Sequence, residues 1–256
     1  MEFGYIVAGF VVGMLVGLTG VGGGSLMTPI LVLFFHVKPA LAVGTDLLYA
    51  SVTKSAGILA HGKLGNIEWK IVRHLAYGSV PASILTTLNL KHMDIASDAA
   101  VSSIKFWLGI ALLVTSLSVL FRNQLRTFSK KEHLINAKWT PYLTVILGII
   151  LGFLVTLTSV GAGALGVTAL LIIYPNRSIN TIIGSDIAHA VPLTLVAGLG
   201  HASIGTVDYG LLGTLLLGSV PGIWIGSHLS SKVAEHWVRI ALAMILIFVG
   251  LKLVFH

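Results

Sequence analysis

Two long apolar segments, 41–60 and 181–200, contain acids, a lysine and a histidine, and a charge there is costly unless it faces a cavity or a partner. Asp46 and Lys54 lie eight residues apart in segment 41–60, and Asp186 and His189 lie three residues apart in segment 181–200. In a helix, Asp46 and Lys54 share one face about 12 Å apart along the axis, and Asp186 and His189 can touch. Lys54 is therefore a candidate to bind an anion, and the other three are candidates to carry a coupled proton.

Each of these residues also has a structural alternative. Asp46 follows Gly44-Thr45 and Asp186 follows Gly184-Ser185, which are typical of helix starts, so either acid could cap a helix. Lys54 could extend its long side chain to the membrane interface. Its counterpart in the repeat described below is Thr194, so a site containing Lys54 is not chemically symmetric.

Two glycine-rich clusters occur in matching positions. Residues 19–26 read Thr-Gly-Val-Gly-Gly-Gly-Ser-Leu, and residues 158–165 read Thr-Ser-Val-Gly-Ala-Gly-Ala-Leu. Glycines leave backbone N–H groups uncovered, and the N-terminus of the helix that follows attracts anions. Close helix packing is the alternative role of the glycines. Together with Lys54, the predicted substrate-binding residues are Thr19, Gly22, Gly23, Gly24, Ser25, Thr158, Ser159, Gly161 and Gly163.

The rest of the chain repeats in the same way. Gly44-Thr45-Asp46 returns as Gly184-Ser185-Asp186 after 140 positions, and Gly78-Ser79-Val80-Pro81 returns as Gly218-Ser219-Val220-Pro221. A duplicated half with glycine-broken apolar segments is typical of a secondary transporter, whose site lies where the halves meet.

Two matching loops follow the ionisable segments. His61 and Gly65 precede Glu68, and His201 and Gly205 precede Asp208. A structural turn is the favoured interpretation, because one histidine and one acid are too few ligands for a metal site.

The apolar segments fall at about 3–19, 26–36, 41–60, 71–90, 101–121, 140–158, 164–174, 181–200, 210–229 and 237–255. Segments 26–36 and 164–174 are too short to cross the hydrocarbon core, which takes about 20 helical residues. We therefore expect 3–36 and 140–174 to form helical hairpins with the glycine clusters at their tips. The predicted fold class is an all-α polytopic membrane protein.

Composition supports this class. The chain is 55% hydrophobic and 10% charged, which excludes an ordinary soluble domain. The apolar runs are continuous rather than alternating, which argues against a β-barrel. The net charge of +7 fits cytoplasmic loops better than nucleic-acid binding. The chain has no cysteine, and we expect no cofactor and no metal.

Loop charge predicts the orientation of the halves. With five segments per half, eleven lysines and arginines fall on one side and four on the other, whereas four segments per half give nine and six. Basic residues concentrate on the cytoplasmic side, so the sharper division favours two inverted five-segment repeats. The expected regions are an N-terminal repeat at 1–121, a cytoplasmic linker at 122–139 and a C-terminal repeat at 140–256, with both termini outside.

The first hairpin (Gly17-Leu18-Thr19-Gly20-Val21-Gly22-Gly23-Gly24), Pro29, Gly44-Thr45 and the His61-Gly65-Ile67 loop are duplicated in order. This arrangement resembles the sulfite exporter TauE/SafE family of membrane anion transporters over essentially the whole chain. The resemblance implies a multi-pass permease of the bacterial inner membrane for sulfite, sulfonates or related oxyanions. The family often has serine at the positions of Asp46 and Asp186, and two acids beside an anion site repel an anion unless they are protonated or paired with Lys54.

The leading hypothesis is an exporter of small sulfur-containing anions, with a proton as the coupling ion. The chain has no Gly-x-x-x-x-Gly-Lys-Ser/Thr motif for ATP, which favours a secondary transporter over an ATP-driven one. A passive anion channel is one alternative. An intramembrane hydrolase with Ser25 or Ser159 as nucleophile and His189 as base is another, but it leaves the duplication unexplained. We do not expect this protein to be an enzyme. The expected partners are the substrate and the lipid bilayer, and a homodimer is left open.

Overall fold

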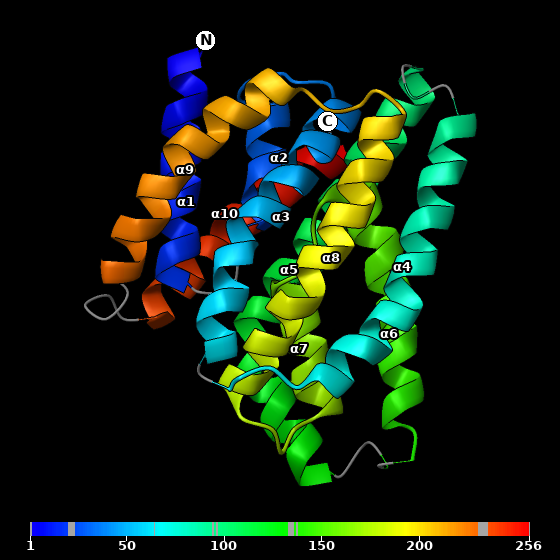
Figure 1. The fold of residues 1–256 in the computed structure, drawn as a ribbon, viewed down its shortest axis with the longest axis vertical. Helices are drawn as coiled ribbons and strands as arrows, with labels where there is room; N and C mark the ends of the chain where they lie inside the picture. Colours follow the sequence, from blue (N-terminus) through cyan, green and yellow to red (C-terminus); the bar gives the residue numbers. More distant parts are fainter. Residues whose placement is uncertain are drawn as a thin grey trace.

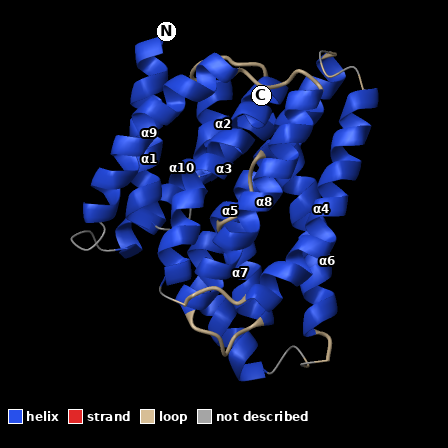
Figure 2. Cartoon of the chain, in the orientation of Figure 1, coloured by secondary structure: helices blue, strands red, loops and turns tan. Residues whose placement is uncertain are grey.

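Over the residues that the structure describes, the chain forms helices joined by loops, without a strand (Figure 2). This computed structural model describes residues 2–19, 24–63, 65–93, 95, 97–132, 136, 138–229 and 235–255. The ten helices within these ranges are α1 (Glu2–Thr19), α2 (Gly24–Leu33), α3 (Pro39–Lys63), α4 (Trp69–His92), α5 (Asp98–Glu132), α6 (Thr140–Thr158), α7 (Ala164–Ile173), α8 (Ile179–Ser203), α9 (Tyr209–Leu229) and α10 (Glu235–Phe255).

Every predicted apolar segment corresponds to one of these helices, because long apolar runs form helices in which each backbone group is satisfied internally. Local signals set some of the ends: the Ser178 side chain accepts a hydrogen bond from the N–H of Thr181 at the start of α8. The largest difference is α5, which continues through most of the predicted linker to Glu132. Its polar end is fixed by tertiary contacts, since the Ser129 hydroxyl donates to the carbonyl of Ile172.

Helix lengths separate two kinds of segment. Helices α2 and α7 have ten residues each, which is too short to cross a bilayer. Among the described residues, four helical stretches are both long and apolar enough to do so: Asp98–Lys130, Thr140–Thr158, Ile179–Ser203 and Tyr209–Leu229.

Figure 1 shows how the two halves of the chain are interleaved. The N- and C-termini lie at the same end of the molecule, whereas the end of α5 and the start of α6 lie at the opposite end. Helix α1 runs beside α9, and α4 runs beside α6. The first helix of each half therefore packs on the fourth helix of the other half.

Glycines make these two helix pairs possible at matching positions. Gly13 of α1 lies against the Ser219 carbonyl of α9, and Gly152 of α6 lies against the Ser79 carbonyl of α4. A Cβ atom at either glycine would collide with that backbone. Ser79 and Ser219 belong to the duplicated Gly-Ser-Val-Pro motif, so the repeat seen in the sequence marks equivalent helix crossings.

Two hydrogen bonds are exchanged between the halves in the same way. The N–H of Asp208, before α9, donates to the Thr45 hydroxyl of α3 at 3.0 Å. The N–H of Glu68, before α4, donates to the Ser185 hydroxyl of α8 at 2.8 Å. Thr45 and Ser185 are repeat equivalents, as are Glu68 and Asp208. Each half thus fixes the loop that precedes the fourth helix of the other half.

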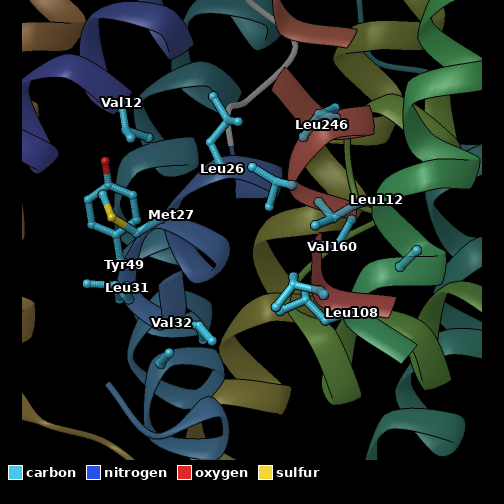
Figure 3. Close-up of a cluster of buried hydrophobic side chains, with 14 of the residues drawn as sticks. Val12, Leu26, Met27, Leu31, Val32, Tyr49, Leu108, Leu112, Val160 and Leu246 are labelled. Carbon is cyan, nitrogen blue, oxygen red and sulfur yellow. The ribbon is translucent and has the colours of Figure 1, made fainter. Parts of the chain in front are cut away.

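The buried core also joins the halves. Figure 3 shows Leu112 of α5 close to Val160, which follows α6, and Leu26 of α2 belongs to the same buried cluster. Leu246 of α10 belongs to the same cluster. The tip between α6 and α7 is therefore anchored among apolar side chains from the first half.

Candidate functional site

The second glycine cluster forms a buried turn between α6 and α7. Ser159 ends α6 with φ 58°, and Gly161 and Gly163 have φ 119° and 126°. Glycine adopts such angles without the strain that a side chain brings. Val160 and Ala162 are almost fully buried, and irregular backbone at membrane depth is tolerated only where protein or a cavity surrounds it. We call residues 159–163 the second tip.

Lys54 of α3 reaches this tip from the other half of the chain. Its Nζ donates a 2.8 Å hydrogen bond to the carbonyl oxygen of Ala162, and the residue is only 6% exposed. The side chain is therefore turned into the protein rather than extended to an interface. Its repeat counterpart, Thr194, donates to the carbonyl of Ala190 within its own helix, so the two halves differ at this position as expected.

Asp46 lies on α3 beside the first turns of α2. Its Oδ2 accepts hydrogen bonds from the Thr28 hydroxyl at 2.6 Å and from the Thr28 N–H at 3.1 Å. The Ser159 hydroxyl lies near the same carboxylate, but Asp46 Oδ1 and the Ser159 hydroxyl oxygen have no hydrogen-bond partner among the described residues. A carboxylate at this place is favoured by the N-terminal end of the α2 dipole.

Asp186 occupies the corresponding place on α8 beside α7, but it is bonded differently. Its carboxylate packs against Gly166, where a Cβ atom would collide with Oδ1. The N–H of Gly163 faces it, yet neither carboxylate oxygen has a hydrogen-bond partner within the described part of the chain. The Lys54 ammonium attracts both acids, Asp186 more strongly than Asp46.

The alternative prediction that Asp46 and Asp186 cap the starts of their own helices is wrong. Helix α3 begins at Pro39 and α8 at Ile179, so Asp46 and Asp186 lie inside their helices, about two turns from the start. The Thr45 and Ser185 hydroxyls accept the exchanged hydrogen bonds instead, and Gly44 packs against the Thr206 carbonyl. Both acids face the N-terminal ends of the short helices from the side.

His189 is directed to α4 rather than to Asp186. Its Nε2 lies 2.7 Å from the Ser79 hydroxyl, and its Nδ1 has no partner in the described ranges. The expected contact between Asp186 and His189 is therefore not made. Ser159 lies near Asp46 instead of His189, so the serine–histidine pair of the hydrolase hypothesis does not form with Ser159.

A matching arrangement surrounds Tyr49, the repeat equivalent of His189. Its hydroxyl faces Ser219, the repeat equivalent of Ser79, without reaching hydrogen-bonding geometry. Sequence reasoning did not single out Tyr49, Thr28 or the role of Ser79. The duplicated Gly-Ser-Val-Pro motif in the sequence could have indicated that Ser79 has a role.

The first glycine cluster is only partly described. Gly22 and Gly23 lie outside the described residues, and the side chains of Thr19 and Ser25 are not described either. Gly24 begins α2, as expected for the helix that follows a glycine tip. In the second cluster, the Thr158 hydroxyl donates to the carbonyl of Leu154 and accepts from the N–H of Val160. That residue is therefore engaged in holding the backbone of the tip.

The histidine loops are turns. Gly65 and Gly205 have φ of 68° and 74°, and each N–H bonds to a carbonyl three residues before it. Both ring nitrogens of His201 are engaged, with the Thr206 hydroxyl at 2.8 Å and the Thr156 carbonyl at 2.9 Å. Within the described part of the chain, no three His, Cys, Asp or Glu side chains are grouped so that they could hold a metal ion.

Comparison with known proteins identifies the family. The family model of the sulfite exporter TauE/SafE matches residues 5–253. The probable membrane transporter protein YjnA of Bacillus subtilis is 39% identical over 256 residues, which cover 99% of this chain and all of that protein.

More distant relatives have similar names. The probable membrane transporter protein YdhB of Bacillus subtilis is 26% identical over 96% of this chain and 97% of its own length. A probable membrane transporter protein of Methanocaldococcus jannaschii is 28% identical over 96% and 92%. No solved structure matches the chain at a significant level.

Family and relatives therefore indicate a membrane transporter rather than an enzyme, and the apolar helices fit a multi-pass membrane protein. The chain belongs to the sulfite exporter TauE/SafE family.

Proposed function

We propose that this protein is a secondary transporter that exports small sulfur-containing anions, such as sulfite or organosulfonates, with a proton as the coupling ion. The anion binds near the midplane, between the two halves of the chain. The family name supports the substrate class, and the buried groups around the second tip support the location.

One observation carries the proposal: the hydrogen bond between Lys54 Nζ and the Ala162 carbonyl. It brings a buried positive charge from the first half to the glycine tip of the second half. The N–H groups of Ala164 and Leu165 begin α7 at the same tip, ahead of its first intrahelical hydrogen bonds, whereas those of Gly166 and Val167 donate to the carbonyls of Gly161 and Gly163. A positive charge and a helix N-terminus together suit an anion, and Thr158, Ser159, Gly161 and Gly163 surround that place.

The proposed architecture is two inverted five-segment repeats at 1–121 and 140–256. Both termini lie at one end of the molecule and the α5–α6 connection lies at the other, which favours this architecture. The exchanged hydrogen bonds of Thr45 and Ser185 also favour it. In such folds one half rocks against the other around a fixed central site. The basic 122–139 region lies on the cytoplasmic side. The membrane is the bacterial inner membrane.

Flux in proteoliposomes tests this function. The purified chain is reconstituted, and efflux of sulfite, methanesulfonate, sulfoacetate, sulfate and chloride is measured with and without a pH gradient. A carrier shows saturable flux and counterflow of labelled sulfonate against an unlabelled excess, whereas a passive channel shows neither. The absence of flux for every sulfur anion would refute the proposed function.

A further inference from the structure

Asp186 is a buried acid whose hydrogen bonds are not satisfied. The residue is 0% exposed, and both carboxylate oxygens lack a hydrogen-bond partner among the described residues. A buried carboxylate in that condition is costly. Such a group persists where it serves a function or changes its state of protonation.

The Asp186 carboxylate lies at the position where a substrate anion would bind. It lies against Gly166 in the first turn of α7, with the N–H of Gly163 facing it. Lys54 is the charged side chain that attracts it. A helix N-terminus and an ammonium group are both attractive to anions, so the Asp186 carboxylate occupies the attractive position itself.

Asp46 provides the contrast. Two hydrogen bonds from Thr28 hold it, and Thr28 precedes it by 18 residues. Thr168 precedes Asp186 by the same interval, but its hydroxyl donates to the carbonyl of Ser118 on α5 at 3.2 Å. The second acid therefore lacks the donor that stabilises the first.

The ionisable groups near Asp186 come from two helices. Lys54, Asp46 and Tyr49 lie on α3, and His189 lies one turn farther along α8 with its Nε2 at Ser79. Helices α6 and α7 contribute glycines and hydroxyls, and the sequence of α7 contains no ionisable side chain. The ionisable residues of α4 fall in its first turns or its last turn. Lys54 is thus the basic side chain whose charge acts on Asp186, without an ion pair between the two.

We propose that Asp186 is an internal anion that competes with the substrate for Lys54 and the N-terminus of α7, and that its protonation lets the substrate bind. Asp46 is a structural acid that fixes α2 through Thr28. This inference rests on the proposed function and names the coupling group of the same site.

The exchange is balanced in charge. One proton from the solution binds an Asp186 carboxylate oxygen, which removes one negative charge from the site. One monoanion then binds at the Lys54 ammonium and the α7 N-terminus, which restores that charge. Release of the anion on the other side lets the proton leave Asp186 to that solution. One proton therefore crosses with each monoanion in the same direction, so an outward gradient of the anion drives export and an inward proton gradient opposes it.

Calorimetry on the detergent-solubilised full chain tests the coupling. Methanesulfonate is the probe, because it stays a monoanion throughout the range studied and takes up no proton itself. Binding is measured between about pH 5 and about pH 8 in buffers of different ionisation enthalpy. We expect uptake of about one proton per anion where Asp186 is ionised, and affinity falling about tenfold per pH unit there. Clear binding without proton uptake at any pH would overturn the inference and the proton coupling, whereas transport of sulfur anions, which the flux assay measures, would stand.

Two matched variants assign the proton to a residue. Asp186→Asn imitates the protonated acid, so it should bind methanesulfonate tightly and without pH dependence. Asp46→Asn should retain the pH dependence of the parent while losing thermal stability. The assignment would be overturned if Asp186→Asn kept the pH-dependent binding of the parent. It would also be overturned if Asp46→Asn lost that pH dependence. If Asp186→Asn does not fold, proton uptake by the parent still decides the coupling. A parent that neither binds nor moves any sulfur anion would overturn the proposed function itself.

Discussion

Lys54 Nζ lies 2.8 Å from the carbonyl oxygen of Ala162, and this hydrogen bond joins residues 108 positions apart in the chain. It connects α3 of the first half to the glycine tip of the second half. A movement of one half against the other must therefore change the surroundings of the Lys54 ammonium. This dependence makes Lys54 the first residue to test.

Replacement of Lys54 by methionine keeps much of the volume and removes the charge. Because a hydrogen bond to a charged group contributes about 2 kcal/mol, we expect roughly thirtyfold weaker anion binding. Lys91→Met is the control, since Lys91 is exposed in the last turn of α4. Isothermal titration with methanesulfonate measures both. Unchanged affinity in Lys54→Met would remove this ammonium from the binding site.

Ser79→Ala removes the hydroxyl that contacts His189 Nε2. Since Nδ1 already lacks a partner in the described ranges, the imidazole would be left with neither nitrogen bonded to protein. We expect a loss of about 1–3 kcal/mol in stability, seen as a lower Tm in detergent.

The matched control is Ser219→Ala, the repeat equivalent of that change. The Ser219 hydroxyl donates within α9 to the carbonyl of Leu216 at 3.4 Å, so its removal should lower the Tm less. Equal effects of the two changes would contradict a specific role for the Ser79–His189 contact.

Gly161→Ala tests the shape of the second tip. A Cβ atom there has room, with the nearest side-chain atoms at 3.6 Å, but the φ of 119° strains any residue except glycine. We expect a cost of about 1–3 kcal/mol and reduced sulfonate flux as the tip changes conformation. Gly213→Ala in α9 is the control, because it is helical and a Cβ atom there would meet nothing within 4 Å outside its own stretch of helix. Equal stability and flux in both variants would show that the tip geometry does not matter.

Single cysteines can test the orientation, because the chain contains none of its own. Glu2→Cys at the start of α1 and Lys130→Cys near the end of α5 introduce exposed thiols, and these two helix ends lie at opposite ends of the molecule. In inside-out and right-side-out vesicles, an impermeant maleimide should label them from opposite sides. Labelling of both from one side would exclude the inverted five-segment arrangement.

The sequence by itself determined the class of the protein and the place of its helices. Apolar runs such as 140–158 and 181–200 were located because hydrophobicity and helix formation are local properties. The family was recognisable from the ordered, duplicated glycine motifs. The duplication also marked Ser79 and Ser219, although not what they contact.

Tertiary structure alone decided the partners of the buried polar groups. The acceptor of Lys54 is a backbone carbonyl, and backbone groups are present at every residue, so the sequence gives no sign of which one is used. Asp46 and Asp186 have similar neighbours in the chain, yet Thr28 holds one while Thr168 turns to α5. That difference arises from how α2 and α7 pack on the other helices. The far end of α5 also remained helical to Glu132, because contacts with the α7 region stabilise a polar stretch that hydrophobicity could not identify.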